Sequence, residues 1–228
     1  MSSVRCVALS NGLRLLHEFV PGSTSVAVNL TVVRGARHEP EALGGVTHFI
    51  EHMLFKGTAG RDLYDVAREI NHQGGSMNAV TSHDYVRAYT RVVNADLGAA
   101  LELVDDMFWG SDFPAVEIER ERGVVLEEIA EYRDFPEDVC FENFQAQLWL
   151  PHPVGRPILG TEESVGALRR EDLAFYWDGI RTPANAILSV AGGVELEEAR
   201  ALAERTFDHA APTVKPGDHP PAGEPRSG

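Results

Sequence analysis

Residues 45–58 read Gly45-Val46-Thr47-His48-Phe49-Ile50-Glu51-His52-Met53-Leu54-Phe55-Lys56-Gly57-Thr58. Two histidines stand four positions apart, with a glutamate directly before the second. Positions i, i+3 and i+4 of a helix share one face, so His48, Glu51 and His52 would point the same way. Two imidazoles, a third protein ligand and an open position make a catalytic zinc site. Glu51 would then act as general base toward a water on the metal.

Three fixed positions also arise by chance, and the stretch would then be a helix with two surface histidines and an unrelated glutamate. The neighbouring residues favour the metal site. Phe49, Ile50 and Met53 follow helical spacing, so they are expected to pack against a core and hold the polar face in place. A purely structural zinc site is less favoured, because it has no use for Glu51 and would leave no vacant position.

A third ligand must come from elsewhere in the chain, and a carboxylate is expected. The segment 122–129 offers two adjacent candidates, Glu127 and Glu128. Neighbouring residues of a helix point about 100° apart, so only one of the two can face the metal.

The order His-x-x-Glu-His is the signature of the inverzincin metallopeptidases. With the motif HFIEHMLFKGT and 75 residues between His52 and Glu128, the chain resembles the pitrilysin/insulysin family of zinc metallopeptidases. It is most similar to the branch of mitochondrial and bacterial processing peptidases. The resemblance implies that His48, His52 and Glu128 bind one Zn²⁺, and that Glu121, two turns earlier on the same helix, orients a histidine.

The resemblance covers residues 3 to 210 and implies a substrate site as well. Segment 78–82 looks like the edge strand that receives the substrate in this family, so Asn78, Ala79 and Thr81 are expected to bind the main chain of a peptide. Asp138 and Glu142 match acidic positions that receive a basic side chain of the substrate, and their spacing places them on one helix face. They would favour arginine upstream of the cleaved bond.

The composition limits the classes of partner. The chain has 228 residues, 43% of them apolar, which suffices for one well-packed domain. A formal net charge of −15 argues against nucleic acid and anionic membranes. No apolar run approaches the roughly 20 residues that cross a bilayer, and the N-terminus lacks the pattern of a secretory signal. A cytoplasmic protein is the resulting expectation, with Cys6 and Cys140 as ordinary buried or half-buried thiols.

Hydrophobic periodicity predicts the elements. Two strands flank the hairpin turn Asn11-Gly12, and a third covers 26–34. After the motif helix at 43–55 comes a helix at 63–73 that ends at Gly74-Gly75, then strands at 76–82 and 84–93. Further helices are expected at 95–109, 114–133, 136–149, 170–180 and 195–207, with a strand at 184–192. Aromatic residues at helical spacing are assigned to the core: Phe108, Trp109, Phe141, Phe144 and Trp149.

This order predicts an α+β domain over residues 1–210. Its sheet is mostly antiparallel with helices packed on one side, as in the LuxS/processing-peptidase-like metallohydrolase domain. Residues 211–228 hold five prolines and three glycines, which predicts a linker or disordered tail.

The processing-peptidase branch normally carries a second domain that closes a chamber and helps to hold the substrate carbonyl. The sequence contains no second domain of this kind. The expected function is therefore a zinc endopeptidase domain for extended or presequence-like peptides, which needs a second domain or partner chain for full activity. The alternative is a non-catalytic scaffold subunit, although such subunits typically lose the metal motif.

Overall fold

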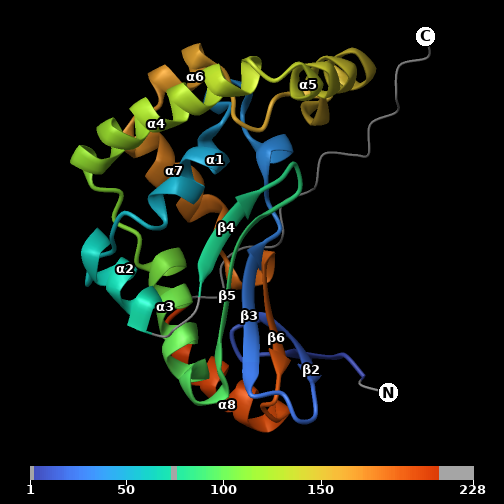
Figure 1. Cartoon of the computed structure of the whole chain (residues 1–228), viewed down its shortest axis with the longest axis vertical. Coiled ribbons are helices and arrows are strands. Elements are labelled where there is room, and N and C mark those ends of the chain that lie inside the picture. The colour runs from blue at the N-terminus through green and yellow to red at the C-terminus, as the bar shows by residue number, and fades with distance from the viewer. Residues whose placement is uncertain (1–2, 73–75, 211–228) are drawn as a thin grey trace.

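The computed structural model describes residues 3–72 and 76–210 (Figure 1). The predicted stop at Gly74-Gly75 and the predicted tail at 211–228 lie outside these residues. Within them, one six-stranded sheet is covered on one side by helices. The fold prediction is confirmed.

The sheet has the strand order β1-β2-β6-β3-β5-β4. All neighbouring strands are antiparallel except β2 and β6, which run parallel. The strands are β1 (Arg5–Ala8), β2 (Arg14–Phe19), β3 (Ser25–Val32), β4 (Met77–Thr81), β5 (Val86–Val93) and β6 (Ala186–Gly192). Strand β4 therefore forms one edge of the sheet and pairs only with β5.

Alternation of side chains decides which face of the sheet is covered. In β3, Val26, Val28, Leu30 and Val32 are fully buried, whereas the residues between them are exposed or half-buried. The paired residues of β5 and β6 follow the same alternation, with their buried members in register with those of β3. Side chains of a strand point alternately to the two faces, so the sheet has one apolar face and one that meets solvent.

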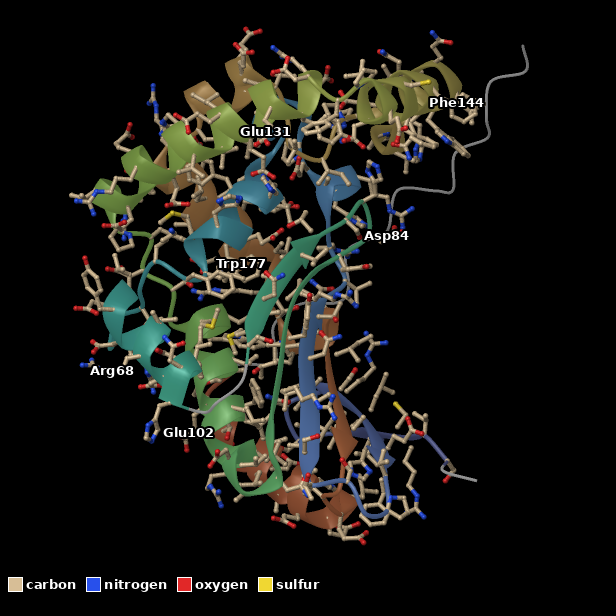
Figure 2. All side chains as sticks on the ribbon, in the orientation of Figure 1. Arg68, Asp84, Glu102, Glu131, Phe144 and Trp177 are labelled. Carbon is tan, nitrogen blue, oxygen red and sulfur yellow. The ribbon has the colours of Figure 1, made fainter. Side chains whose placement is uncertain are left out.

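Eight α-helices of the described residues flank the sheet, mostly on its apolar face. They are α1 (Val46–Met53), α2 (Leu63–His72), α3 (Leu97–Trp109), α4 (Ala115–Arg133), α5 (Pro136–Trp149), α6 (Glu162–Ala167), α7 (Arg170–Ile180) and α8 (Leu196–Thr206). Trp177 of α7 lies inside this layer, is fully buried, and donates its indole N–H to the carbonyl oxygen of Phe108 at 2.9 Å (Figure 2). Helix α1 contacts α4, α7 and β4, so it lies between the helical layer and the edge of the sheet.

Two predictions of buried side chains are wrong. The spacing of Phe141 and Phe144 predicts core positions, but they are 71% and 60% exposed. The reason is that α5 sits at the outer end of the molecule and buries none of its residues fully (Figure 2). Cys6 and Cys140 are likewise exposed rather than buried, because β1 is an edge strand and Cys140 lies on α5.

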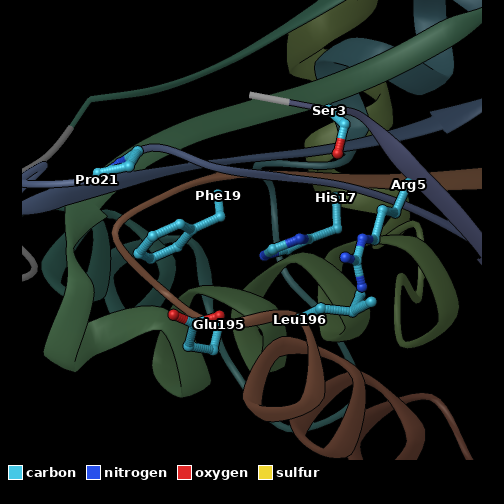
Figure 3. Close-up of a pocket in the computed structure, with 7 residues that line it drawn as sticks. All are labelled: Ser3, Arg5, His17, Phe19, Pro21, Glu195 and Leu196. Atoms are coloured by element: carbon cyan, nitrogen blue, oxygen red, sulfur yellow. The ribbon is translucent and has the colours of Figure 1, made fainter. Parts of the chain in front are cut away.

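A cavity of about 340 Å³ lies at the edge of the sheet opposite to β4 (Figure 3). Its walls come from the β1–β2 hairpin and the start of α8. His17 is buried there and donates its Nε2–H to the carbonyl oxygen of Val194 at 2.8 Å. That hydrogen bond ties β2 to the segment that leads into α8. In the described part of the chain, no helix combines the length and apolarity required to cross a membrane.

Candidate metal centre

Helix α1 carries the three residues of the His-x-x-Glu-His motif. Its apolar side consists of Phe49, Ile50 and Met53, all with no exposed surface, as helical spacing predicts. With that side fixed in the core, the opposite side of the helix presents His48, Glu51 and His52 toward α4 and β4. Packing of the apolar side thus determines the direction of the polar one.

Helix α4 supplies the carboxylates. Glu121 and Glu128 are two turns apart on it, and both contact the histidines of α1. Glu127 is exposed, and no ion pair or hydrogen bond joins it to the histidines among the described residues. Of the two adjacent carboxylates, Glu128 is the one that faces the motif helix.

Three atoms converge between the two helices. Oε2 of Glu128 lies 3.4 Å from Nε2 of His52 and 3.7 Å from Nε2 of His48. Ligands at about 2.1 Å from a tetrahedral zinc ion are roughly 3.4 Å from one another. The observed spacing therefore fits a single small cation, and these residues form the group that the described chain offers for a metal ion.

Further contacts fix the orientation of His52. Its Nδ1 donates to Oε2 of Glu121 at 3.2 Å, which leaves the lone pair of Nε2, on the side of Glu128, free to bind a cation. The second carboxylate oxygen of Glu121 accepts from Nζ of Lys56 at 2.7 Å. A histidine ligand commonly donates its other ring N–H to a carboxylate in this way. His48 differs, because its Nδ1 is buried with no hydrogen-bond partner among the residues that the structure describes.

Burial sets the protonation of the site. It lowers the pKa of His48 to about 3, with a further contribution from His52, so the imidazole is neutral at neutral pH and its nitrogen can bind a cation. Burial also raises the pKa of Glu51, and the Thr81 side chain and main chain oppose that rise. A carboxylate with a raised pKa is a stronger base, which suits general-base chemistry.

The centre opens into a cleft of about 500 Å³. Its floor holds His48, Glu51 and Glu128. Of the predicted substrate residues, Thr81 and Glu142 line it, whereas Asn78, Ala79 and Asp138 do not. The other residues in its walls are Val80, His83, Tyr132, Phe141, Gln145, Pro157, Ile158 and Leu159.

Strand β4 passes the cleft with one side unpaired. A two-residue turn joins β4 to β5, closed by a hydrogen bond of 2.8 Å from the Ser82 N–H to the Tyr85 carbonyl. Pairs of an antiparallel ladder alternate between bonded and non-bonded, so Ala79 and Thr81 direct their main-chain groups toward the free edge. The Ala79 N–H there donates to the Asn78 side chain at 2.9 Å. Ala79 and Asn78 therefore belong to the edge although they do not line the cleft.

The β4–β5 turn is also tied to the segment that precedes α1. The Ala36 N–H donates to the Ser82 carbonyl at 2.9 Å. Arg37 forms an ion pair of 2.7 Å with Asp84 at the tip of the turn (Figure 2). These contacts hold the edge strand in a fixed position relative to the motif helix.

Sequence reasoning missed several residues of the site. Lys56 lies within the quoted motif, and its spacing of four from His52 could have indicated that it shares a partner with that histidine. Tyr132 lies one turn beyond Glu128, so helical spacing could have placed it in the cleft. Phe141 and Gln145 carried no such signal, because they reach the cleft only through the tertiary placement of α5.

Comparison with known proteins identifies the family. Residues 14–162 match the model of the insulinase family of peptidases, peptidase family M16. The chain belongs to this family. An uncharacterized zinc protease of Mycobacterium leprae is 40% identical over 199 residues, which are 87% of this chain and 45% of that protein. A second one, from Bacillus subtilis, is 36% identical over 81% of this chain and 45% of its own length.

Solved structures agree on the M16 fold. A protease from Helicobacter pylori superposes with a TM-score of 0.92 at 23% identity, over 99% of this chain and 55% of that one. An M16-like peptidase from Alicyclobacillus acidocaldarius gives 0.82 at 24% identity, over 98% and 52%. The chain thus spans about half the length of the relatives that it matches.

Proposed function

We propose that this M16 domain is a zinc-dependent endopeptidase domain. The observation that carries the proposal is that His48, His52 and Glu128 lie together, with Oε2 of Glu128 3.7 and 3.4 Å from the two histidine nitrogens, and that His48 and Glu128 line a cleft. The zinc protease names of the relatives support it. Zinc held there would act as a Lewis acid toward a carbonyl and would lower the pKa of a water molecule.

The residues of the chain then have distinct tasks. Glu51 takes the proton of the attacking water and returns it to the leaving amine. Its raised pKa and its place beside Thr81 at the edge strand suit that task. Glu121 contacts Nδ1 of His52, and Lys56 contacts Glu121. Together they fix the orientation of the His52 ring, whose Nε2 is the proposed zinc ligand.

The substrate in this proposal is an extended peptide that lies along β4. It pairs with the main-chain groups that Ala79 and Thr81 direct to the free edge, and it displaces the bond between Ala79 and Asn78. Main-chain pairing reads little sequence, so selectivity falls to the walls of the cleft. Glu142, in those walls, receives a basic side chain, whereas Asp138 contributes only at longer range.

A second peptidase-like domain or subunit completes the activity. The chain spans about half of the relatives that it matches, and the open side of the cleft is where another body would close over the peptide. Removal of a single donor to a reacting oxyanion typically costs ~10²–10³ in rate. The 228-residue chain alone is therefore expected to bind zinc but to cleave peptides weakly or not at all.

The test compares the wild-type chain with Glu51→Gln. Zinc content is measured by metal analysis, and peptide turnover is measured with the chain alone and after addition of a candidate second domain. An enzyme keeps its zinc in the variant and loses turnover by ~10²–10⁴. A scaffold subunit shows no turnover to lose under either condition, and a wild-type chain without zinc would contradict the proposal outright.

A further inference from the structure

A buried carboxylate lies beneath the first turn of α1, on the side away from the metal cleft. Glu39 is 5% exposed. Its Oε2 accepts from the Gly45 N–H and its Oε1 from the Thr47 N–H, both at 2.8 Å. Glu39 and its neighbours in the sequence do not belong to the group formed by His48, His52 and Glu128.

These two amides belong to the start of a helix that has no cap of its own. The first N–H groups of a helix have no partner within the helix. The N-cap residue of α1 is Gly45, which offers no side chain, and its φ of 87° is a conformation that favours glycine. Glu39 therefore supplies the missing acceptors from six and eight residues upstream.

Two other parts of the chain hold this cap in place. Arg156 donates to the main-chain oxygen of Glu39 at 2.9 Å. On α7, the Tyr176 hydroxyl accepts from Oγ1 of Thr47 at 3.2 Å. The start of α1 is thereby joined to the loop before α6 and to α7.

The loop also packs directly against the main chain at Gly45. A Cβ atom on Gly45 would come within 2.5 Å of the Leu159 carbonyl oxygen, and one on Gly160 within 2.5 Å of the Gly44 oxygen. Only glycine fits at both positions. The helix start therefore has little freedom to shift.

We propose that Glu39 is a positioning residue that fixes the start of α1 and, through it, the placement of His48 and His52 against Glu128. His48 directly follows Thr47, so a shift of the first turn moves the first ligand of the motif. The proposal rests on the proposed zinc site. The alternative is that Glu39 contributes only to the stability of the fold.

Burial itself argues against a role in stability alone. It raises the pKa of Glu39 to about 7 against the opposing effect of the Thr47 and Gly45 hydrogen bonds. A carboxylate that the fold holds at such a cost is a weak means of stabilisation. Its two hydrogen bonds to the N-terminus of α1 instead suit it to fix the position of that helix.

The experiment compares Glu39→Gln with wild type and with Val190→Ala. The glutamine has an acceptor for only one of the two amides. Val190 is a buried residue of β6, outside the group around α1, so its variant reports general destabilisation. Each folded protein is titrated with Co²⁺, the visible spectrum of the bound ion is recorded, and hydrogen exchange is measured at the amides of Gly45 and Thr47.

We expect Glu39→Gln to lose ~10-fold in Co²⁺ affinity, to shift the Co²⁺ bands, and to exchange faster at both amides. Val190→Ala keeps the wild-type affinity and bands. A folded Glu39→Gln with the affinity and bands of wild type would overturn the proposal. If Glu39→Gln does not fold, Glu39→Asp replaces it; its shorter carboxylate reaches only one of the amides, so a smaller loss supports the proposal and no loss overturns it.

Failure of the zinc site itself would be seen separately. A wild-type chain that takes up no Co²⁺ contradicts the proposed function. The exchange data then decide the role of Glu39: faster exchange confined to the start of α1 supports it, and unchanged exchange overturns it.

Discussion

Nε2 of His52 lies 3.4 Å from Oε2 of Glu128, although the two residues belong to different helices, α1 and α4. The contact joins the motif helix to the helix that contributes the third proposed ligand. It places the partly exposed Glu128 at the floor of the cleft, where a substrate carbonyl can reach the same point. Glu121 is buried and accepts a hydrogen bond from Nδ1, the other ring nitrogen of His52.

Replacement of Glu128 should remove the metal, whereas replacement of its neighbour should not. We expect Glu128→Gln to lower zinc affinity at least ~100-fold, because loss of a ligand exceeds the 10–100-fold effect of outer contacts. Glu127→Gln should bind zinc as wild type does, since Glu127 is exposed and outside the group. Zinc titration against a chromophoric chelator measures both. Equal losses in the two variants would contradict the assignment.

Glu121 and Lys56 should affect the zinc affinity indirectly, through the orientation of His52. Glu121→Gln removes the charge that accepts from His52, so we expect zinc affinity to fall by ~10–100-fold. Lys56→Met leaves Glu121 without its 2.7 Å partner and should cause a smaller fall. Glu131→Gln, an exposed substitution on the same helix, serves as the control (Figure 2). An unchanged affinity in Glu121→Gln would show that His52 needs no such support.

Stability should depend on pH through Glu39. Its pKa in the folded chain is raised to about 7 from the ordinary 4.5, so its contribution to the free energy of unfolding is complete below about pH 4.5 and is lost as pH rises through 7. The loss amounts to roughly 3 kcal/mol. Glu39→Gln has no such titration. Urea unfolding of both proteins from pH 4.5 to 8 should therefore show their difference shifting in favour of the variant as pH rises; a constant difference would contradict it.

Glu142 should select a basic side chain, and Asp138 should matter less. Peptides that differ only in Arg or Ala upstream of the scissile bond are bound to zinc-loaded Glu51→Gln, which prevents cleavage. We expect the Arg peptide to bind about five-fold more tightly, the value of a partly exposed ion pair of about 1 kcal/mol. Adding Glu142→Gln should remove that preference, whereas adding Asp138→Asn should retain most of it, because only Glu142 lines the cleft. The same preference in all three proteins would exclude Glu142 from this role.

Most of the fold was predictable from local pattern. The spacing of Phe49, Ile50 and Met53 determined the buried side of α1, and the alternation of Val26 to Val32 determined the buried face of β3. Spacing along α4 likewise brought Glu121 and Glu128 to one side of that helix. These features depend on a single element at a time, which is why the sequence alone reveals them.

The remainder depends on tertiary placement. Phe141 and Phe144 have the spacing of core residues but lie on α5, which buries none of its residues, and stay largely exposed. Glu39 gave no signal either, because it reaches the start of α1 only through the bend at residues 40–45. An apolar residue shows that burial is possible, but only the arrangement of elements decides whether another surface covers it.

The most direct test of the central claim is anomalous diffraction at the zinc absorption edge from crystals of the chain grown with one equivalent of Zn²⁺. We predict one peak within about 2.2 Å of Nε2 of His48, Nε2 of His52 and Oε2 of Glu128. A map with no peak among these three atoms, or with its only peak elsewhere on the chain, would contradict the account.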